Sequence, residues 1–302
     1  MNVFRKHTEF LAICLAAAAL AQPAFSDFSA EVSAGVEYDS NISVERLDIN
    51  TTESDYAALV DLDLDYKLSL TKAVKVTTGY SFSQSLHQDL DDFDVQTHLF
   101  SAGLSSDFGR TTAGVNYYYA DSSLGGDGFL TLQQASPYIS HYFTKQVFLR
   151  SAFTYTDKDF DGRPARDADA AALGADLYYF IDGSKHYVSF GYKYEDEDAN
   201  TDRFDHDSQQ LRLRWVKRLD ILGKESKLKL GWRYEQRDYD AIDSAGTRRR
   251  DDDRHRWEAE LELPLSKQSY LALEYQYSDY ESTLAAADYT QHMARVRAGY
   301  KF

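Results

Sequence analysis

The sequence has 302 residues with 33 Lys and Arg against 49 Asp and Glu, and this acidity argues against nucleic-acid binding, which needs a basic face. Aromatic residues make up 14% of the chain, and Tyr, with 23 copies, is the commonest of them. Beyond residue 26 there is no run of about 18 apolar residues, which excludes a transmembrane helix but not a membrane β-barrel, whose strands are apolar on one face only.

The first 26 residues have the composition of a secretory signal peptide. Two cations precede a short apolar stretch, and Ala24-Phe25-Ser26 offers small residues before cleavage at Asp27. The one cysteine, Cys14, lies inside this segment. We therefore expect an exported mature chain, residues 27–302, that forms a single domain without disulfides.

From Asp27 onward one unit repeats: an alternating strand, a polar loop, a second strand and a tight turn. In the first strand, Phe28, Val32 and Tyr38 share one face, and Glu31 and Glu37 lie on the other. This period of 2 predicts strands with one apolar face. The expected strands cover 28–38, 56–68, 74–82, 95–106, 113–119, 131–143, 147–155, 171–179, 188–194, 211–215, 228–234, 257–263, 271–277 and 289–302. Pro137 predicts a bulge or a local loss of pairing in the sixth.

The connections alternate in length. Short turns are expected near 71–73, 107–110, 144–146, 182–184, 220–224 and 266–268, and longer polar loops near 39–55, 84–94, 121–129, 157–168, 196–204, 238–253 and 279–288. Bacterial outer-membrane barrels sort their connections in this way. We predict an all-β fold, a transmembrane antiparallel up-and-down β-barrel of about 14 strands with short periplasmic turns and long extracellular loops. The expected location is the bacterial outer membrane, in contact with its lipid and lipopolysaccharide.

The last strand ends on aromatic residues. Tyr300 and Phe302 lie on the same face as Val296 and Ala298, which the alternation assigns to the lipid side. A terminal aromatic residue in this position resembles the C-terminal recognition signal of bacterial outer-membrane barrels. We interpret Tyr300 and Phe302 as an assembly signal, with the barrel assembly machinery as the partner.

Charged residues of several strands are predicted to face a water-filled lumen. We select as selectivity candidates Asp61, Asp63, Asp65, Arg212, Arg214, Lys229, Arg233, Arg256, Glu258, Glu260, Arg295 and Arg297. Opposite charges on neighbouring strands can neutralise one another, or they can set up a transverse field that selects solutes. The two interpretations are compatible.

Three other patterns carry little chemistry. Residues 157–162 match the first half of a calcium loop, but Ala168 stands where the bidentate Glu belongs. The charged tracts 89–94, 196–202 and 248–255 are interpreted as solvated loop tips that could also meet divalent ions or lipopolysaccharide phosphates. Asp253 and His255 lie two residues apart at a predicted rim of the barrel, and this spacing is only a weak indication of a catalytic pair. We expect no metal site, no cofactor and no enzyme.

Short stretches across the mature chain resemble the barrel domain of surface lipoprotein assembly modifiers. They are Val36-Glu37-Tyr38-Asp39-Ser40-Asn41-Ile42, Tyr155-Thr156-Asp157-Lys158-Asp159-Phe160, the run at 248–254 and the C-terminal stretch from Tyr289 to Phe302. The resemblance implies an outer-membrane barrel that takes part in lipoprotein export. Members of that family normally carry a helical repeat domain before the barrel, and we find no helical hairpin repeat in this sequence.

These patterns favour a porin-like passive channel for small polar solutes. The alternative is a barrel that exports or assembles surface lipoprotein, or polysaccharide, with a periplasmic helper. A third possibility is a structural or adhesive barrel whose own loops plug the lumen.

Overall fold

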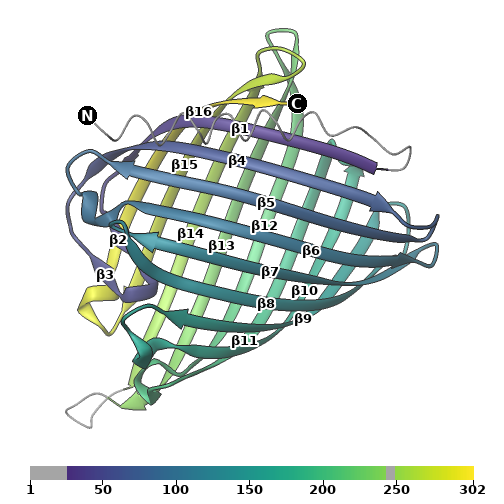
Figure 1. Ribbon diagram of the computed structural model, residues 1–302. Helices are drawn as coiled ribbons and strands as arrows, with labels where there is room; N and C mark the ends of the chain where they lie inside the picture. The colour runs from purple at the N-terminus through teal and green to yellow at the C-terminus, as the bar shows by residue number, and fades with distance from the viewer. Residues whose placement is uncertain (1–25, 243–248) are drawn as a thin grey trace.

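The computed structural model describes residues 26–242 and 249–302, which form one closed barrel of antiparallel strands (Figure 1). Each strand of the barrel wall is hydrogen-bonded to the wall strands before and after it in the sequence. The first wall strand, β1, pairs with the last, β16, and this pairing closes the barrel. The wall strands are β1 Ser26–Asp39, β4 Asp55–Ser69, β5 Val74–His87, β6 Val95–Asp107, β7 Thr111–Leu124, β8 Asp127–Tyr142, β9 Val147–Phe160, β10 Ala168–Asp182, β11 His186–Ala199, β12 His206–Ile221, β13 Lys224–Ile242, β14 Arg249–Pro264, β15 Ser269–Ser282 and β16 Tyr289–Lys301. The predicted barrel of 14 strands is confirmed.

The predicted signal peptide lies outside the described residues except for Ser26, the first residue of β1. Within the described ranges, no helix is both long and apolar enough to span a bilayer. The helices present there are single 3-10 turns in the connections: η1 Glu45–Leu47, η2 Asp91–Phe93, η3 Pro164–Arg166, η4 Asp202–Phe204 and η5 Ala285–Ala287.

The wall alternates with a period of 2. In β4, Asp55 and Ala57 are each 4% exposed, whereas Tyr56 is 59% exposed and Val60 is 40% exposed. Successive side chains of a strand point to opposite faces, so the first pair lines the lumen and the second pair forms the outside. The exposed apolar face is the surface that lipid covers.

Most connections follow the predicted alternation of length. Short turns at 70–73, 108–110, 143–146, 183–185, 222–223 and 265–268 join the strands at one end, and longer connections at 40–54, 88–94, 161–167, 200–205 and 283–288 join them at the other. In Figure 1 the longer connections gather at the lower left and the short turns at the upper right.

Two predicted loops are wrong because the strands run further outward than the apolar pattern. The sequence predicts a loop over 121–129, but β7 and β8 continue to a turn at Gly125 and Gly126, both with positive φ. Most of the predicted loop 238–253 is also strand. Polar residues occupy both faces of these extensions, so no apolar alternation marks them as strands.

The irregularity predicted at Pro137 is confirmed on one side of β8. Pairing with β7 runs unbroken past Pro137, which lies opposite Val115, whereas pairing with β9 stops at Ala135 and resumes at Tyr138. Proline has no N–H to donate, so one edge of the strand loses its hydrogen bonds there.

Aromatic rings form a stacked row on the outside of the C-terminal strands. The ring centroid of His255 lies 5.3 Å from that of Trp257 and 4.8 Å from that of Tyr234, and Trp257 and Tyr277 are 5.4 Å apart. Asp253 belongs to the same face, where it accepts a hydrogen bond of 2.5 Å from the Tyr234 hydroxyl. The sequence pair Asp253 and His255 is therefore part of an aromatic girdle of the kind that marks a bilayer interface.

Candidate functional site

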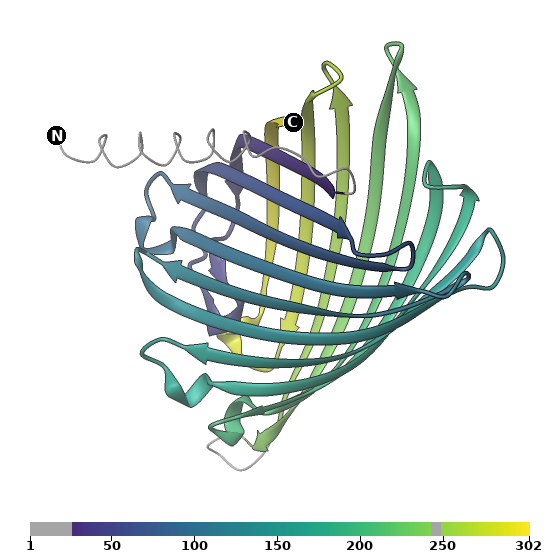
Figure 2. The ribbon, with the colours of Figure 1, turned by 45° about the vertical axis from the view of Figure 1, so that its right-hand side comes forward.

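The connection between β1 and β4 turns into the barrel. This segment, residues 40–54, holds η1 and the two short strands β2 Ser43–Val44 and β3 Ile49–Asn50, which pair with each other. We call it the lumen loop. Its Ile42 and Leu47 are only 3% and 6% exposed, so the loop packs within the barrel. In Figure 2 its purple trace is seen behind the front strands, next to the yellow C-terminal strands.

Glu45 anchors the lumen loop to the wall formed by β13, β14 and β15. Its carboxylate lies 2.7 Å from Nη1 of Arg254 and 3.2 Å from Nη2 of Arg256. Nη2 of Arg237 is 3.4 Å away, and the Tyr280 hydroxyl donates a hydrogen bond of 3.3 Å. Three neighbouring strands therefore converge on one carboxylate of the loop.

Leu47 anchors the loop to the far wall. It belongs to a buried cluster with Phe129 and Leu130 of β8 and Phe160 of β9. Arg166 of η3 donates a hydrogen bond of 3.1 Å to the Leu47 carbonyl. Because β8 and β14 are separated by β9 to β13 in a closed ring of 14 strands, the loop joins nearly opposite walls. It crosses the lumen at the end where the longer connections lie.

Asp48 connects the two anchors. Nη2 of Arg250, from β14, lies 2.7 Å from one of its carboxylate oxygens, and Nη2 of Arg166 lies 2.9 Å from the other. The fully buried Asp252 then bridges Arg250 at 2.8 Å and Arg254 at 2.9 Å. The loop carboxylates and the wall arginines form one continuous charge network.

The charges of this network stabilise one another. Burial alone raises the pKa of Glu45, but Arg237 and Arg254 outweigh it and hold that pKa below its ordinary value. Burial likewise raises the pKa of Asp48, and the hydrogen bond and charge of Arg250 lower it to a net value below the ordinary one. Both loop carboxylates are therefore ionised at neutral pH, which keeps the loop attached.

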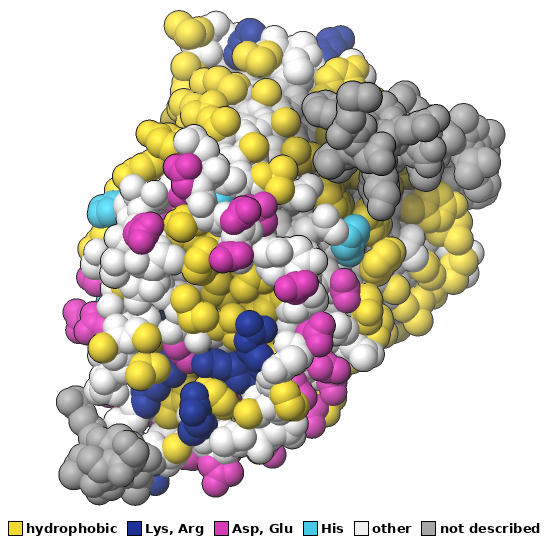
Figure 3. All heavy atoms as spheres, turned by 60° about the vertical axis from the view of Figure 1, so that its left-hand side comes forward, with side chains coloured by type: hydrophobic (Ala, Val, Ile, Leu, Met, Phe, Trp, Pro, Cys, Tyr) yellow, Lys and Arg dark blue, Asp and Glu magenta, His cyan; other side chains and the backbone are white. Residues whose placement is uncertain are grey.

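A cavity remains on each side of the lumen loop. One of about 410 Å³ is lined by Glu45, Arg46 and Asp48 of the loop together with β8, β9, β11 and β13. The other, of about 360 Å³, is lined by residues 42–45 of the loop together with β1, β5, β15 and β16. Figure 3 looks toward the loop end, where Lys and Arg side chains gather in one cluster.

Deeper in the lumen, predicted charges pair along the wall. Nη1 of Arg297, on β16, lies 3.3 Å from Asp61 on β4, although β1 stands between these strands. Gly35 occupies the β1 position opposite Arg297, and a Cβ there would lie 2.7 Å from Cγ of Arg297. The absent side chain gives the arginine room to cross the strand.

The same arrangement recurs on the opposite wall. Nη2 of Arg212, on β12, lies 3.0 Å from Oδ1 of Asp176 on β10, and Gly191 of β11 stands between them. A Cβ on Gly191 would lie 2.4 Å from that same oxygen. Lys229 and Glu260, on adjacent strands, pair directly at 2.6 Å. These candidates are therefore paired with opposite charges inside the wall.

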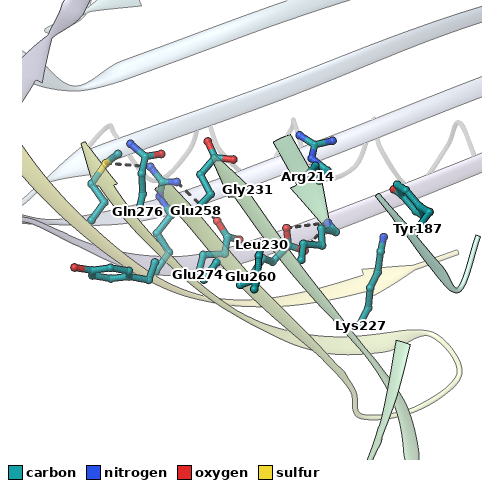
Figure 4. A pocket seen from close by; sticks show the side chains of 14 residues that line it. Tyr187, Arg214, Lys227, Leu230, Gly231, Glu258, Glu260, Glu274 and Gln276 are labelled. Atoms are coloured by element: carbon teal, nitrogen blue, oxygen red, sulfur yellow. Dashed lines mark hydrogen bonds and ion pairs between the residues drawn. The ribbon is translucent and has the colours of Figure 1, made fainter. Parts of the chain in front are cut away.

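The remaining lumen candidates differ in their surroundings. Arg295 pairs with Glu37 and lies 3.8 Å from Glu274. Asp63 accepts a hydrogen bond of 2.6 Å from Ser81, and Asp65 stands beside Gly79. In a cavity deeper in the lumen, also of about 410 Å³, Arg214 and Glu258 line the wall (Figure 4). Arg233 lines the outer cavity next to the lumen loop, and Arg256 holds Glu45.

Tyr300 and Phe302 lie on the outer surface at the short-turn end. They are 37% and 66% exposed, and their ring centroids are 4.8 Å apart. The backbone N–H of Phe302 donates to Ala30 of β1, which ties the C-terminus to the barrel seam.

The functional residues that the sequence reasoning missed are the lumen loop and its arginines. The tract 248–255, interpreted as a solvated loop tip, lies from Arg249 onward in β14, and Arg250 and Arg254 face inward with 13% and 4% of their side chains exposed. Residues 157–160, from the half calcium loop, are strand residues of β9. No group of three or more potential metal ligands occurs within 26–242 and 249–302. The apolar residues Ile42, Val44 and Leu47 were the available signal, because a solvated loop rarely carries such a set.

Comparison with known proteins assigns the chain to a family. The family model described as surface lipoprotein assembly modifier matches residues 27–302, which is the whole barrel. The chain belongs to this family. The resemblance read from the short sequence stretches is confirmed. No curated protein sequence matches the chain.

Solved structures similar to this family member are porin-like barrels. An anion-selective porin from Comamonas acidovorans is 11% identical with a TM-score of 0.55, over 92% of this chain and 99% of that one. The outer-membrane expressed OmpT of Vibrio cholerae is 10% identical with a TM-score of 0.57, over 94% and 99%. At such identities the likeness establishes the fold alone. The family and the fold together make the protein a bacterial outer-membrane β-barrel.

Proposed function

We propose that the protein is an outer-membrane conduit in the assembly of surface lipoproteins, and that the lumen loop closes it at rest. The family match supports the class of cargo. The observation that carries the closure is the crossing of the lumen by residues 40–54, which are attached to both walls through side chains. Side-chain contacts can break without opening the hydrogen-bonded wall, so the loop can leave while the barrel stays folded.

The loop attachments suit a reversible closure. The charges on the wall are arginines of β13 and β14, and the charges on the loop are Glu45 and Asp48. Polar cargo that offers its own carboxylates can take the place of the loop on these arginines, since guanidinium groups bind carboxylates in a planar, two-point geometry. Export of the chain from the cytoplasm by the predicted signal peptide, and insertion into the outer membrane through Tyr300 and Phe302, belong to the same proposal.

A second candidate function is passive diffusion of small polar solutes. The cavities of about 410 and 360 Å³ beside the loop favour it, because they are lined by charged side chains and lie along the lumen while the loop is in place. Such cavities have the size of small-molecule sites and not of a polypeptide passage. The two functions therefore differ in whether the loop must move.

A tether separates the two candidates. Leu47 and Phe129 belong to one buried cluster, so cysteines at these positions can be joined by a short bismaleimide. The barrel is co-expressed with a surface lipoprotein, and surface display of that lipoprotein is measured by protease access on intact cells. Export through the lumen predicts that the tether abolishes display, while the two single-cysteine variants treated with the same reagent retain it.

The result for small solutes is read from the same tethered protein in planar bilayers. A passive channel predicts conductance that the tether leaves unchanged. Lipoprotein display that persists in the tethered protein would contradict passage of the cargo through this lumen. A barrel that displays no lipoprotein but conducts when tethered would leave passive diffusion as its function.

A further inference from the structure

Three arginines stand in register on neighbouring strands of the lumen wall. Arg212 of β12 is directly opposite Arg233 of β13, and Arg233 is directly opposite Arg256 of β14. Like charges in directly opposed positions destabilise a sheet. Such a row needs negative charge nearby to offset the repulsion.

The outer two arginines of the row have carboxylate partners, and the central one does not. Arg212 holds Asp176 at 3.0 Å, and Arg256 holds Glu45 at 3.2 Å. Among the described residues, Arg233 forms no ion pair and no side-chain hydrogen bond. The same is true of Arg214, which lies two residues from Arg212 on β12 and opposite Gly231. Within the described residues, neither arginine is therefore neutralised by an ion pair, although Glu258 lines the same cavity as Arg214 and the whole chain has a net charge of −16.

Both unpaired arginines face space that a ligand can fill. Arg233 lines the cavity of about 410 Å³ beside the lumen loop, and Arg214 lines the deeper one of the same volume. In Figure 4 Arg214 projects from its strand with no dashed line to any side chain drawn. The two residues are diagonal neighbours across β12 and β13, a position in which backbones are about 7–8 Å apart and long side chains reach one another.

We propose that Arg233 and Arg214 form a binding site in the lumen wall for a ligand that carries a carboxylate or phosphate group. Glu45 illustrates the chemistry, since its carboxylate occupies the neighbouring Arg256 in this same row. The planar fork of a guanidinium group matches two oxygens of either anion. A bound oxyanion would supply the negative charge that the centre of the row lacks. The site does not depend on the cargo of the conduit, because binding alone reveals it.

The test is a binding titration on the full barrel in detergent micelles, with citrate and inorganic phosphate as probes. We expect saturable binding of at least one probe at low salt. Arg233→Gln removes a charged hydrogen-bonding group and should weaken that binding about tenfold or more. Arg214→Gln should also weaken the binding of that probe. Binding of citrate alone assigns the site to carboxylates, and binding of phosphate alone assigns it to phosphates.

Arg218→Gln is the matched control. Arg218 also belongs to β12 but lies near the short-turn end, where it pairs with Glu225 at 2.7 Å. Heat-modifiability on gels checks that each variant folds, and Arg233→Lys, which keeps the charge without the planar fork, serves if Arg233→Gln does not fold. If Arg218→Gln weakens binding as much as Arg233→Gln does, the proposed site is wrong and the probes respond only to the overall charge of the barrel. The absence of saturable binding for both probes would also overturn the proposed site.

Discussion

The outer and deeper parts of this lumen use the same residue types but neutralise their charges differently. In the outer part, arginines of β13 and β14 pair with Glu45 and Asp48 of the lumen loop, a segment that takes no part in the wall. In the deeper part, charges pair between wall strands, as Arg297 and Asp61 do across Gly35. The outer ion pairs can therefore separate while the strands of the wall stay hydrogen-bonded. The deeper ion pairs join residues of the wall itself, whose positions are fixed by the strand register. Under the proposed function, this difference confines gating to the outer end.

Removing the lumen loop should have the largest effect. Replacement of residues 40–54 by a tight Asn-Gly turn joins β1 directly to β4, which are already paired along their length. Conductance in planar bilayers should rise severalfold, because the segment that crosses the lumen is gone. The matched control shortens 200–205, a connection at the same end, and should leave conductance near that of the natural protein. Equal conductance of the loop-deleted and natural proteins would contradict closure by this loop.

Arg254→Ala tests the buried network itself. Its side chain is 4% exposed and holds both Glu45 at 2.7 Å and Asp252 at 2.9 Å. The substitution leaves two carboxylates with less compensation, and loss of one partner of a buried pair costs about 3–5 kcal/mol. Urea unfolding in lipid vesicles measures the change.

The control for Arg254→Ala lies at the short-turn end. Lys185 pairs with Glu225, and both side chains are about half exposed, at 58% and 48%. Lys185→Ala should change the unfolding free energy by no more than about 1 kcal/mol, because exposed pairs contribute little. Equal losses for the two variants would mean that the outer network is no more important to stability than a solvated pair.

The contrast between the two parts also explains what the sequence could predict. Strands such as β4 were predictable, because an apolar residue at every second position reports a wall between lipid and water. The outer part of β14 was not, since Arg250, Asp252 and Arg254 alternate with other polar residues and no apolar face remains. The ion pair between Arg297 and Asp61, which spans one strand, could not be predicted as such. The sequence predicted only that opposite charges in the lumen can neutralise one another, because the choice of partners depends on the strand register.

The inward position of the lumen loop could not be predicted from the sequence for a different reason. Glu45 and Arg254 are 209 residues apart in the sequence, and only the closed barrel brings them together. Composition marks 39–55 as a polar loop and cannot say whether it turns outward or inward. The arginine row has the same origin, because it requires the register of three strands.

Acid should release the loop and raise the conductance, but by less than deletion of the loop does. The pKa values of Glu45 and Asp48 lie below their ordinary values in the folded protein, so their contribution to loop attachment is complete at pH values above the ordinary carboxylate pKa. It is lost as the pH falls through the depressed folded values. Conductance should stay flat through the neutral range and rise only in strongly acidic solution.

Glu45→Gln sharpens the acid experiment. It keeps the size and polarity of the side chain while removing the charge, so conductance should be raised already at neutral pH and should respond less to acid. Asp279→Asn, a substitution on the outer face of β15, is the control and should titrate like the natural protein. A rise in conductance centred near neutral pH would contradict control by these carboxylates and point to a histidine.

The smallest expected effect concerns the deeper lumen. Asp63 and Asp65 face the lumen and, within the described residues, form no ion pair with a cation. Permeating ions should therefore feel their charge over the Debye length, about 10 Å at 0.1 M salt and about 3 Å at 1 M. The double substitution to Asn should shift the reversal potential in a salt gradient by a few millivolts toward anion preference at low salt, and the shift should vanish near 1 M. Asp279→Asn removes one of the same charges from the outside of the wall and should give no shift. A reversal potential that does not move at low salt would mean that the ion path avoids β4, and that the deeper wall is neutral along its length.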